Sequence, residues 1–469
     1  MILKKSIDKF LSVIFIPLII IHLIFLISTR FTLWPEMLVY PYLLNNHFIL
    51  YKDLINPYPP TLAILLSFIT RVFGYSPEFL RGLTWVFIIF IDISILVIAK
   101  TIFKKISKAN LSLIFFIFIS IPFLVNGLWY DLIQTPFILF SVYYFYEFIK
   151  DENKKSLQKS LFLLLVSILI KQQATWLAIW YFLFLFFKYL KTREIPTREI
   201  IVPVFVFLLL FLSYSLYSIR NNNFSEFFFW TVIFPFFKAS SLPGYTLFPS
   251  LKQISIILLL PLLAINVFFN SKKEIRFIWL TGLVLFLFAY PRFDYFHLIP
   301  SLSVFAILIP ISLPISVKKI SIINVIPVAS LVLLVVFFIH YYQRNNSTEI
   351  RFFERDMLSS ASSIKIITQK NVPIYIQNGP DQLLVLAHRL PPKPWAIQFP
   401  WYLEIPGMQE KIIKGFKNEN QNYIVSKPYN HEGDLELGSY QPKLLTDYID
   451  NNYHNYYKIS DTLWLKTKN

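Results

Sequence analysis

Apolar residues occur in long runs along most of the chain, and short polar segments separate these runs. A helix that crosses the hydrocarbon core of a bilayer needs about 20 mostly apolar residues. Runs of roughly this length fall at 10–29, 81–101, 110–126, 131–149, 159–172, 174–190, 200–219, 253–269, 277–290, 297–315 and 321–342. The pattern therefore predicts an all-α polytopic membrane domain with about 11 transmembrane helices.

A shorter apolar segment, at 58–74, lies inside the first polar loop. It begins with Tyr58-Pro59-Pro60 and is too short to span a bilayer comfortably. We expect it to form a helix that lies at the membrane interface. Ser76-Pro77-Glu78 then marks the start of the next helix, because proline is favoured in the first turn.

Composition supports the membrane assignment. Of the 469 residues, 56% are hydrophobic and only 15% are charged, whereas a soluble domain has about 25% charged residues. This excludes a water-soluble globular enzyme. The net charge of +17 comes from small basic clusters between apolar runs, so it predicts no nucleic-acid partner. The chain has no cysteine, which excludes disulfides, thiolate metal sites and nucleophilic thiols.

Basic residues concentrate in every second loop, and this bias predicts the orientation. The loop after the second apolar run, for example, contains Lys100, Lys104, Lys105 and Lys108. Since cytoplasmic loops carry the excess of lysine and arginine, we expect a multi-pass protein of the cell (plasma or inner) membrane with a cytoplasmic N-terminus. An odd number of spans then places the C-terminal domain outside the cytoplasm.

The chain is predicted to have two domains, a transmembrane domain at 1–343 and a soluble extracytoplasmic domain at 344–469. The second region lacks long apolar runs and is rich in Asn, Asp, Glu and Lys. It alternates helix-like segments at 352–368, 409–417 and 442–451 with strand-like segments at 372–376, 423–426, 456–459 and 462–465. We therefore expect a small α/β domain.

The first outer loop contains two carboxylates among aromatic residues, Glu36 in TLWPEMLVY and Asp53 in LYKD. A carboxylate at this depth can act as a base on a hydroxyl group and also reach a lipid-linked head group. An ordinary polar loop with a prolyl turn explains the same residues equally well. The residues alone leave both interpretations open.

Three further polar segments are predicted on the outer side. Asp131 begins the fourth run, Lys171 ends the fifth, and Arg292, Asp294 and His297 belong to the segment YPRFDYFH. Lys171 and Arg292 together would suit a phosphate, which arginine binds bidentately and lysine binds as a point charge. Snorkelling of the lysine and a simple Arg–Asp salt bridge are the structural alternatives.

In this order, the segments resemble the GT-C superfamily of integral-membrane glycosyltransferases. The likeness is to the branch that groups protein mannosyltransferases, aminoarabinose transferases and RgtA/B/C/D-like proteins. It covers about residues 8–343 and rests on Glu36, on Leu50 to Pro60 (LYKD and PYPP), on Asp131, on Ile170-Lys171 and on Tyr290 to His297. The paired acidic motif of the family is reduced here to Pro35-Glu36, so Glu36 and Asp53 both remain candidates for the base.

The resemblance implies an inverting glycosyltransferase that uses a polyprenyl-phosphate-linked sugar at the extracytoplasmic face. Glu36 or Asp53 would be catalytic, and Asp131, Lys171, Arg292, Asp294 and His297 would bind substrate. The acceptor would be a lipid, a glycan or a protein. Some relatives use a divalent metal, but the chain has no dense acidic cluster, so we expect neither a metal nor another cofactor.

Two other classes of protein fit part of the pattern. A polysaccharide polymerase or ligase normally has its large loop late in the membrane domain. A transporter or flippase of lipid-linked glycans would place several ionisable groups near the bilayer midplane. In this sequence only Asp92 is predicted at such a position. In the C-terminal domain, 373–383 (PIYIQNGPDQL) and 390–407 (LPPKPWAIQFPWYLEIPG) fit either an acceptor-binding surface or a cap that completes the fold.

Overall fold

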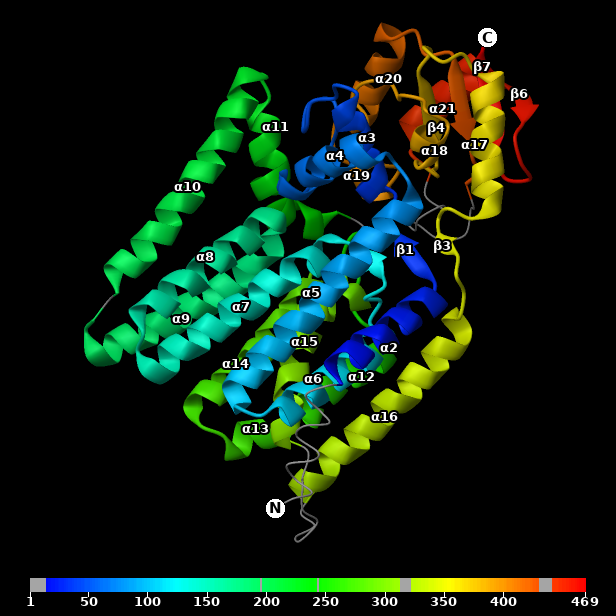
Figure 1. Cartoon of the computed structure of the whole chain (residues 1–469). Coiled ribbons are helices and arrows are strands. Elements are labelled where there is room, and N and C mark those ends of the chain that lie inside the picture. The colour runs from blue at the N-terminus through cyan, green and yellow to red at the C-terminus, as the bar shows by residue number, and fades with distance from the viewer. Residues whose placement is uncertain (1–13, 195, 243, 313–321, 430–440) are drawn as a thin grey trace. The chain divides into compact units, whose positions relative to one another are not determined.

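The computed structural model describes residues 14–194, 196–242, 244–312, 322–429 and 441–469, and within them helices predominate (Figure 1). The chain divides into two compact units, which are described separately. The membrane unit comprises Met1–Phe31, Gly82–Ser213 and Phe248–Thr348. The loop–tail unit comprises Thr32–Arg81, Tyr214–Leu247 and Glu349–Asn469.

Most long helices belong to the membrane unit. They are α2 (Phe15–Ser28), α5 (Pro77–Phe103), α6 (Ile106–Ser120), α7 (Tyr130–Asp151), α8 (Lys154–Ile170), α9 (Thr175–Thr192), α10 (Thr197–Arg220), α12 (Leu251–Leu263), α13 (Ile265–Asn270), α14 (Lys273–Val284), α15 (Ile299–Ser312) and α16 (Ile322–Asn345). Short elements complete it, namely β2 (Gly127–Leu128), η1 (Gln172–Ala174), η4 (Leu285–Ala289) and η5 (Tyr295–Leu298). The unit boundaries cut α5 near its start and α10 near its end.

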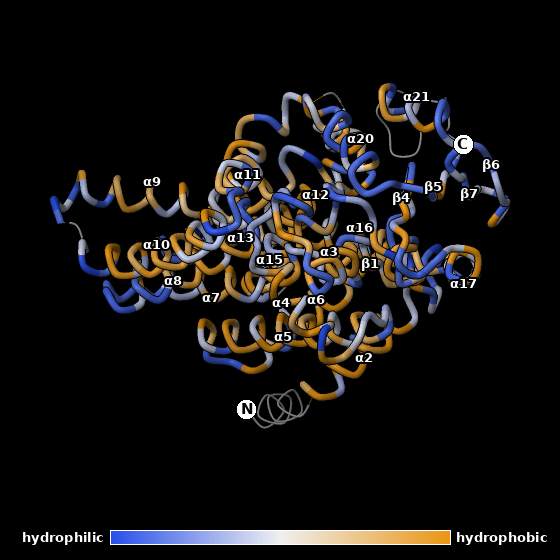
Figure 2. The backbone as a smooth tube through the Cα atoms, turned by 90° about the horizontal axis from the view of Figure 1, so that it is seen from above, coloured by the Kyte–Doolittle hydropathy of each residue, from blue (hydrophilic) through white to orange (hydrophobic). Residues whose placement is uncertain are grey.

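Each predicted span has a helix, or two consecutive helices, as its counterpart in the described residues. Seven helices there are long and apolar enough to cross a membrane, and α2, α4 (Thr61–Phe73) and α6 are shorter apolar helices. Hydrophobic residues dominate the long helices (Figure 2). The first predicted span begins among residues 10–13, which lie outside the described residues. The predicted polytopic helical fold is confirmed, whereas the number of eleven spans stays a prediction.

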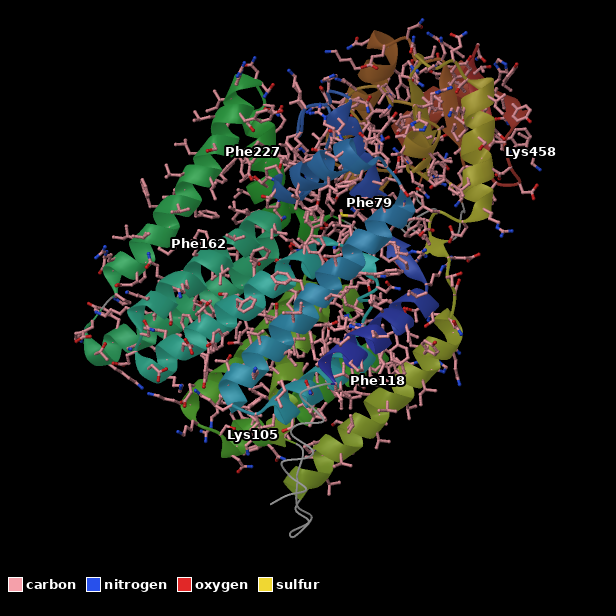
Figure 3. All side chains as sticks on the ribbon, in the orientation of Figure 1. Phe79, Lys105, Phe118, Phe162, Phe227 and Lys458 are labelled. Carbon is pink, nitrogen blue, oxygen red and sulfur yellow. The ribbon has the colours of Figure 1, made fainter. Side chains whose placement is uncertain are left out.

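Large apolar side chains on the outer helices are exposed, as a lipid environment requires. Phe205 and Leu208 on α10 are 59% and 54% exposed, and Phe162 on α8 also faces outward (Figure 3). By contrast, α15 is buried along nearly its whole length. Gly282 allows α14 to approach it, because a Cβ atom there would come 2.8 Å from the Phe305 ring.

Helices α7 and α8 form a tight antiparallel hairpin. Glu152, directly after α7, adopts a left-handed conformation, and the Asn153 side chain accepts hydrogen bonds from backbone N–H groups in the first turn of α8. Ser141 and Ser160 donate to each other's backbone carbonyl oxygens at 2.9 and 2.8 Å. Small residues allow this close approach of two helices, and the hairpin brings the start of α7 to the end of α8.

The loop–tail unit combines two outer loops with the C-terminal segment. Its elements are β1 (Phe31–Leu33), α3 (Glu36–Asn45), α4, α11 (Phe224–Phe228), η2 (Phe229–Lys238), η3 (Ala239–Ser241), β3 (Ile350–Arg351), α17 (Arg355–Ile367), β4 (Ile374–Gln377), α18 (Leu383–Leu386), α19 (Pro400–Leu403), α20 (Met408–Asn418), β5 (Tyr423–Ser426), α21 (Lys443–Asn452), β6 (Tyr453–Lys458) and β7 (Trp464–Lys468). The helix predicted in the first outer loop is present as α4, and the predicted α/β character of the tail is confirmed.

The tail contains a four-stranded sheet with the order β4-β5-β7-β6. Strands β4 and β5 are parallel, with Ile374 opposite Tyr423, whereas β7 is antiparallel to both β5 and β6. Ile424, Val425 and Leu465 are fully buried and form the centre of the sheet. The adjacent carboxyl ends of β4 and β5 are the edge at which ligands often bind in sheets with parallel strands.

Candidate functional site

The α7–α8 hairpin brings two predicted site residues together. Asp131 is the second residue of α7, and Lys171 directly follows α8 in an extended conformation. The Lys171 ammonium nitrogen lies 2.5 Å from Asp131 Oδ2, and both side chains are completely buried. The antiparallel pairing of the helices thus explains why residues 40 positions apart form an ion pair.

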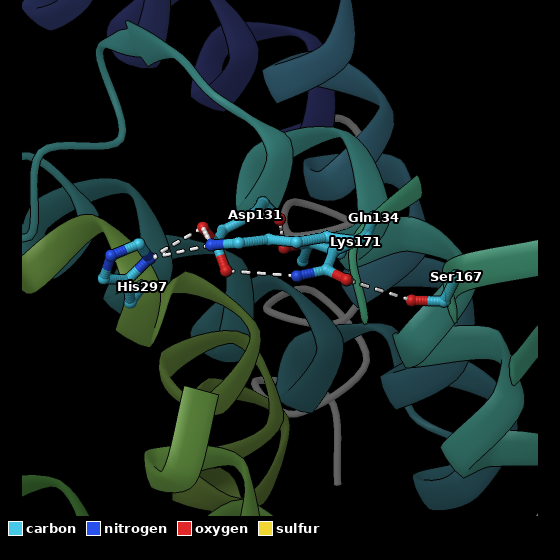
Figure 4. Close-up of polar contacts among 6 residues, drawn as sticks. Asp131, Gln134, Ser167, Lys171 and His297 are labelled. Atoms are coloured by element: carbon cyan, nitrogen blue, oxygen red, sulfur yellow. Dashed lines mark hydrogen bonds and ion pairs between the residues drawn. The ribbon is translucent and has the colours of Figure 1, made fainter. Parts of the chain in front are cut away.

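His297, from η5, completes a buried trio (Figure 4). Its Nδ1 atom lies 2.8 Å from Asp131 Oδ2 and 3.1 Å from the Lys171 nitrogen. With a proton on Nδ1 the ring donates to Asp131, and with the proton on Nε2 it accepts from Lys171. The position of the proton on the His297 ring therefore decides whether the ring binds Asp131 or Lys171. In either case the charged lysine lies close to the histidine.

Two polar residues that the sequence analysis missed orient the trio. Gln134 Nε2 donates to Asp131 Oδ1 at 3.1 Å, and Ser167 donates to Gln134 Oε1 at 3.2 Å (Figure 4). Gln134 is three residues after Asp131 on the same face of α7, and Ser167 lies in the last turn of α8, four residues before Lys171. That spacing is the sequence signal that could have found them.

Arg292 and Asp294 lie in the segment before η5, and both are partly buried. The Asp294 side chain accepts a hydrogen bond from the Tyr295 backbone N–H and caps η5, which carries His297. The predicted segment YPRFDYFH thus supplies His297 to the trio, and Asp294 fixes the start of η5, on which His297 lies.

Glu36, in the loop–tail unit, is the first residue of α3 and is only 3% exposed. Among the described residues, its Oε2 atom has no hydrogen-bond partner. Burial raises the pKa of Glu36 to about 8, a backbone hydrogen bond at Glu36 opposes the shift, and the Asp381 carboxyl adds to it. A carboxyl group in this state is a strong base once it has lost its proton.

Asp53 is in a different environment from Glu36. Its Oδ2 accepts from Lys393 Nζ at 2.9 Å and from the Ile49 backbone N–H at 3.1 Å. The backbone beside it is also fixed, because Trp395 donates to the Asp53 carbonyl oxygen and accepts from Ile55. Asp53 therefore joins the first outer loop to the tail, whereas Glu36 keeps an unpaired oxygen.

The structure thus places Asp131, Lys171 and His297 together in the membrane unit, and Glu36 and Asp53 in the loop–tail unit. The catalytic and substrate-binding roles of all seven predicted residues stay predictions. Within the described residues, no group of three or more His, Cys, Asp or Glu side chains is placed to hold a metal ion. The expectation that no metal or other cofactor is needed also remains a prediction.

The fold is that of a polytopic membrane protein with a small C-terminal sheet, and solved structures share it. ArnT from Cupriavidus metallidurans bound to undecaprenyl phosphate aligns over 97% of this chain and 97% of its own, with a TM-score of 0.60 and 11% identity. ArnT in the apo state gives the same values. The archaeal oligosaccharyltransferase AglB from Archaeoglobus fulgidus, in complex with an inhibitory peptide and a dolichol-phosphate, aligns over 98% of this chain and 74% of its own, with a TM-score of 0.53 and 11% identity.

No protein-family model matches the chain, and no curated protein matches it at the level of sequence. The likeness to ArnT and AglB is therefore one of fold. It confirms the predicted polytopic helical fold with a small C-terminal sheet.

Proposed function

We propose that this protein is a membrane glycosyltransferase that transfers a sugar from a polyprenyl-phosphate-linked donor to a hydroxyl-bearing acceptor at the extracytoplasmic face. The main support is the environment of Glu36, a buried carboxyl group whose Oε2 has no hydrogen-bond partner among the described residues, in a chain of this fold. Support for the donor class comes from the solved relatives in fold, which are bound to undecaprenyl phosphate and to a dolichol-phosphate.

In this mechanism Glu36 accepts the proton of the acceptor hydroxyl as the acceptor oxygen attacks the anomeric carbon of the donor. The new C–O bond forms as the bond from the anomeric carbon to the phosphate oxygen breaks, and the configuration inverts. The polyprenyl phosphate leaves with the electron pair of the broken bond. Glu36 is preferred to Asp53 as the base because Lys393 already neutralises Asp53.

The cationic residues of the membrane unit would offset the charge on the leaving phosphate. Lys171 provides a point charge and Arg292 a bidentate donor, while His297 donates through a ring nitrogen. Asp131 holds Lys171 in place through the buried ion pair, and Asp294 caps the element that carries His297. Fixed charges of this kind stabilise a transition state most strongly where water is excluded.

The test is a transfer assay with purified protein in liposomes, a panel of polyprenyl-phosphate sugars, and lipid, glycan and peptide acceptors. We expect Glu36→Gln to lower turnover by about 10²–10⁴-fold, whereas Glu404→Gln, an exposed acid of the same unit, should change it less than about twofold. Full activity in Glu36→Gln would contradict the mechanism. Movement of the donor across the bilayer without its cleavage would instead identify a flippase.

The proposed orientation has a separate test, which uses the absence of cysteine from the chain. Single cysteines at Lys105, in the loop between α5 and α6, and at Asp461, in the tail, both fall at exposed positions. In intact cells a membrane-impermeant thiol reagent should label Asp461→Cys and leave Lys105→Cys unlabelled until the cells are permeabilised. The reverse pattern would overturn the proposed topology.

A further inference from the structure

A second buried acid, Asp381, lies in the same unit as Glu36 and belongs to neither of the predicted residue sets. It is 3% exposed and sits in the segment PIYIQNGPDQL, between β4 and α18. Helix α18 packs against α3, the helix that begins with Glu36. Asp381 lies just before α18 and Glu36 begins α3, so the two carboxyl groups belong to segments that pack against each other.

One oxygen of the Asp381 carboxyl is held by a hydrogen bond. Its Oδ2 accepts from the Gln398 backbone N–H at 3.1 Å, while Gln398 Nε2 donates to the Tyr375 hydroxyl of β4 at 2.8 Å. Its other oxygen, Oδ1, is buried and makes no hydrogen bond of standard geometry among the described residues, although the Trp395 side chain is near enough to lower the pKa of Asp381. This geometry fixes the direction of the carboxyl and leaves one acceptor atom unsatisfied, which is costly in a buried position.

The chain around Asp381 is also tied to the first outer loop. Trp395 forms the backbone contacts with Asp53 and Ile55, and its ring packs edge-on against Tyr40 of α3 at 6.1 Å between centroids. Burial raises the pKa of Asp381 to about 7, and the Gln398 backbone N–H and the Trp395 side chain oppose this shift. The Asp381 charge in turn raises the pKa of Glu36.

In their ionised form, two buried carboxyl groups that each have an oxygen without a hydrogen bond among the described residues favour a ligand that donates hydrogen bonds. A hydroxyl-bearing molecule supplies such donors. Its hydroxyl group can donate a hydrogen bond to either carboxyl oxygen before Glu36 removes its proton. No phosphate would bind there, since it would repel the carboxylates. The site of Glu36 and Asp381 therefore suits the acceptor and not the charged part of the donor.

We propose that Asp381 completes the acceptor site of Glu36, so that the C-terminal tail positions the acceptor hydroxyl on the catalytic base. This inference rests on the proposed function and adds the residue that orients the acceptor. Asp381 is a positioning residue, because the proton of the acceptor hydroxyl passes to Glu36. In the part of the chain that the structure describes, the Tyr402 hydroxyl interacts electrostatically with Glu36 and the Tyr375 hydroxyl with Asp381.

The kinetic test compares Asp381→Asn with Asp461→Asn, a fully exposed acid of the same domain. Asp381→Asn should raise the KM for the acceptor by about 10–100-fold and leave the KM for the polyprenyl-phosphate sugar unchanged. Asp381→Glu should restore part of the lost acceptor affinity. An unchanged acceptor KM in a folded Asp381→Asn protein, or an equal rise for both substrates, would overturn the inference.

A spectroscopic test does not depend on transfer. Infrared difference spectra between about pH 6 and about pH 9 report carboxyl protonation, and the band lost in Glu36→Gln identifies that residue. In Asp381→Asn this band should titrate at lower pH by several tenths of a unit, because a neighbouring negative charge is gone. No shift would overturn the pairing. A shift in a protein that transfers no sugar would keep the carboxyl pair and contradict the proposed function.

Discussion

The Lys171 ammonium group and the Asp131 carboxylate form a completely buried ion pair. Removing one partner leaves an uncompensated charge, so Lys171→Met or Asp131→Asn alone should cost about 3–5 kcal/mol of stability. The double variant should regain most of that stability but not the transfer activity. Thermal unfolding in detergent and turnover per folded molecule check the two parts. An active double variant would show that the pair is only structural.

A second buried pair in the membrane unit provides the control. His22 Nδ1, on α2, lies 2.8 Å from Asp92 Oδ2, on α5, and both residues are at most 1% exposed. Asp92 is recognisable in the sequence as a mid-span acid, but no local pattern links it to His22, 70 residues earlier. We expect Asp92→Asn to destabilise the protein and to leave turnover per folded molecule unchanged. A loss of turnover equal to that of Asp131→Asn would give the His22–Asp92 pair a functional role.

The raised pKa of Glu36 predicts the pH dependence of the reaction. Since the base must be deprotonated and its pKa is about 8, kcat/KM should rise about tenfold per pH unit below pH 8 and level off above it. Kinetics over a pH series in one buffer system measure this limb. A profile that is flat between pH 6 and pH 9 would exclude Glu36 as the base.

The same shift predicts how stability varies with pH. Burial raises the pKa of folded Glu36 from 4.5 to about 8, so between these values the folded state binds more protons than the unfolded state. Its contribution to the free energy of unfolding therefore falls as the pH rises through this window. Glu36→Gln should raise Tm at about pH 9 relative to the unaltered protein, and have little effect at about pH 4. Equal Tm changes at both pH values would contradict the raised pKa.

Local patterns in the sequence predict most of the fold. Apolar run length identifies the helices, and the strand predicted at 423–426 coincides with β5. The site is predicted less fully, because its contacts join distant parts of the chain. Asp53 and Lys393 are 340 residues apart, and no local periodicity reports such a pair. Asp381 resembles any acid in a polar turn until burial and an unpaired oxygen distinguish it.

The Asp53–Lys393 ion pair is partly exposed, so its removal should have a small effect. Asp53→Asn should cost about 1 kcal/mol or less and leave the pH limb of the reaction unchanged. The pH profile and the unfolding curve of Asp53→Asn, each compared with Glu36→Gln, test this. If the pH-dependent rise of kcat/KM shifts in Asp53→Asn and not in Glu36→Gln, Asp53 and not Glu36 is the base.

Gly415 on α20 lies against the segment that carries Trp395. A Cβ atom there would clash with the Lys393 carbonyl oxygen, so Gly415→Ala should destabilise the loop–tail unit by about 1–3 kcal/mol. Gly82→Ala is the control, since a Cβ atom there meets nothing within 4 Å. Limited proteolysis of the tail measures the effect. Equal protease resistance in both variants would show that the contact is not maintained.

We expect the reaction to proceed without a divalent metal. Transfer should be unchanged after treatment with EDTA and after addition of Mg²⁺ or Mn²⁺, because in the proposed mechanism carboxyl and cationic side chains supply both proton removal and charge stabilisation. Loss of activity in EDTA, with recovery on adding a metal, would contradict this expectation.

The backbone hydrogen bonds that join Trp395 to Asp53 and Ile55 have a consequence for biogenesis. The loop that carries Glu36 emerges early in synthesis, but the segment it pairs with is made more than 300 residues later. A nascent chain therefore inserts its helices well before its acidic loop acquires the final shape. If the protein has the proposed topology and function, we expect activity only after the last quarter of the polypeptide has been exported, and a prematurely terminated chain should be inactive in the bilayer.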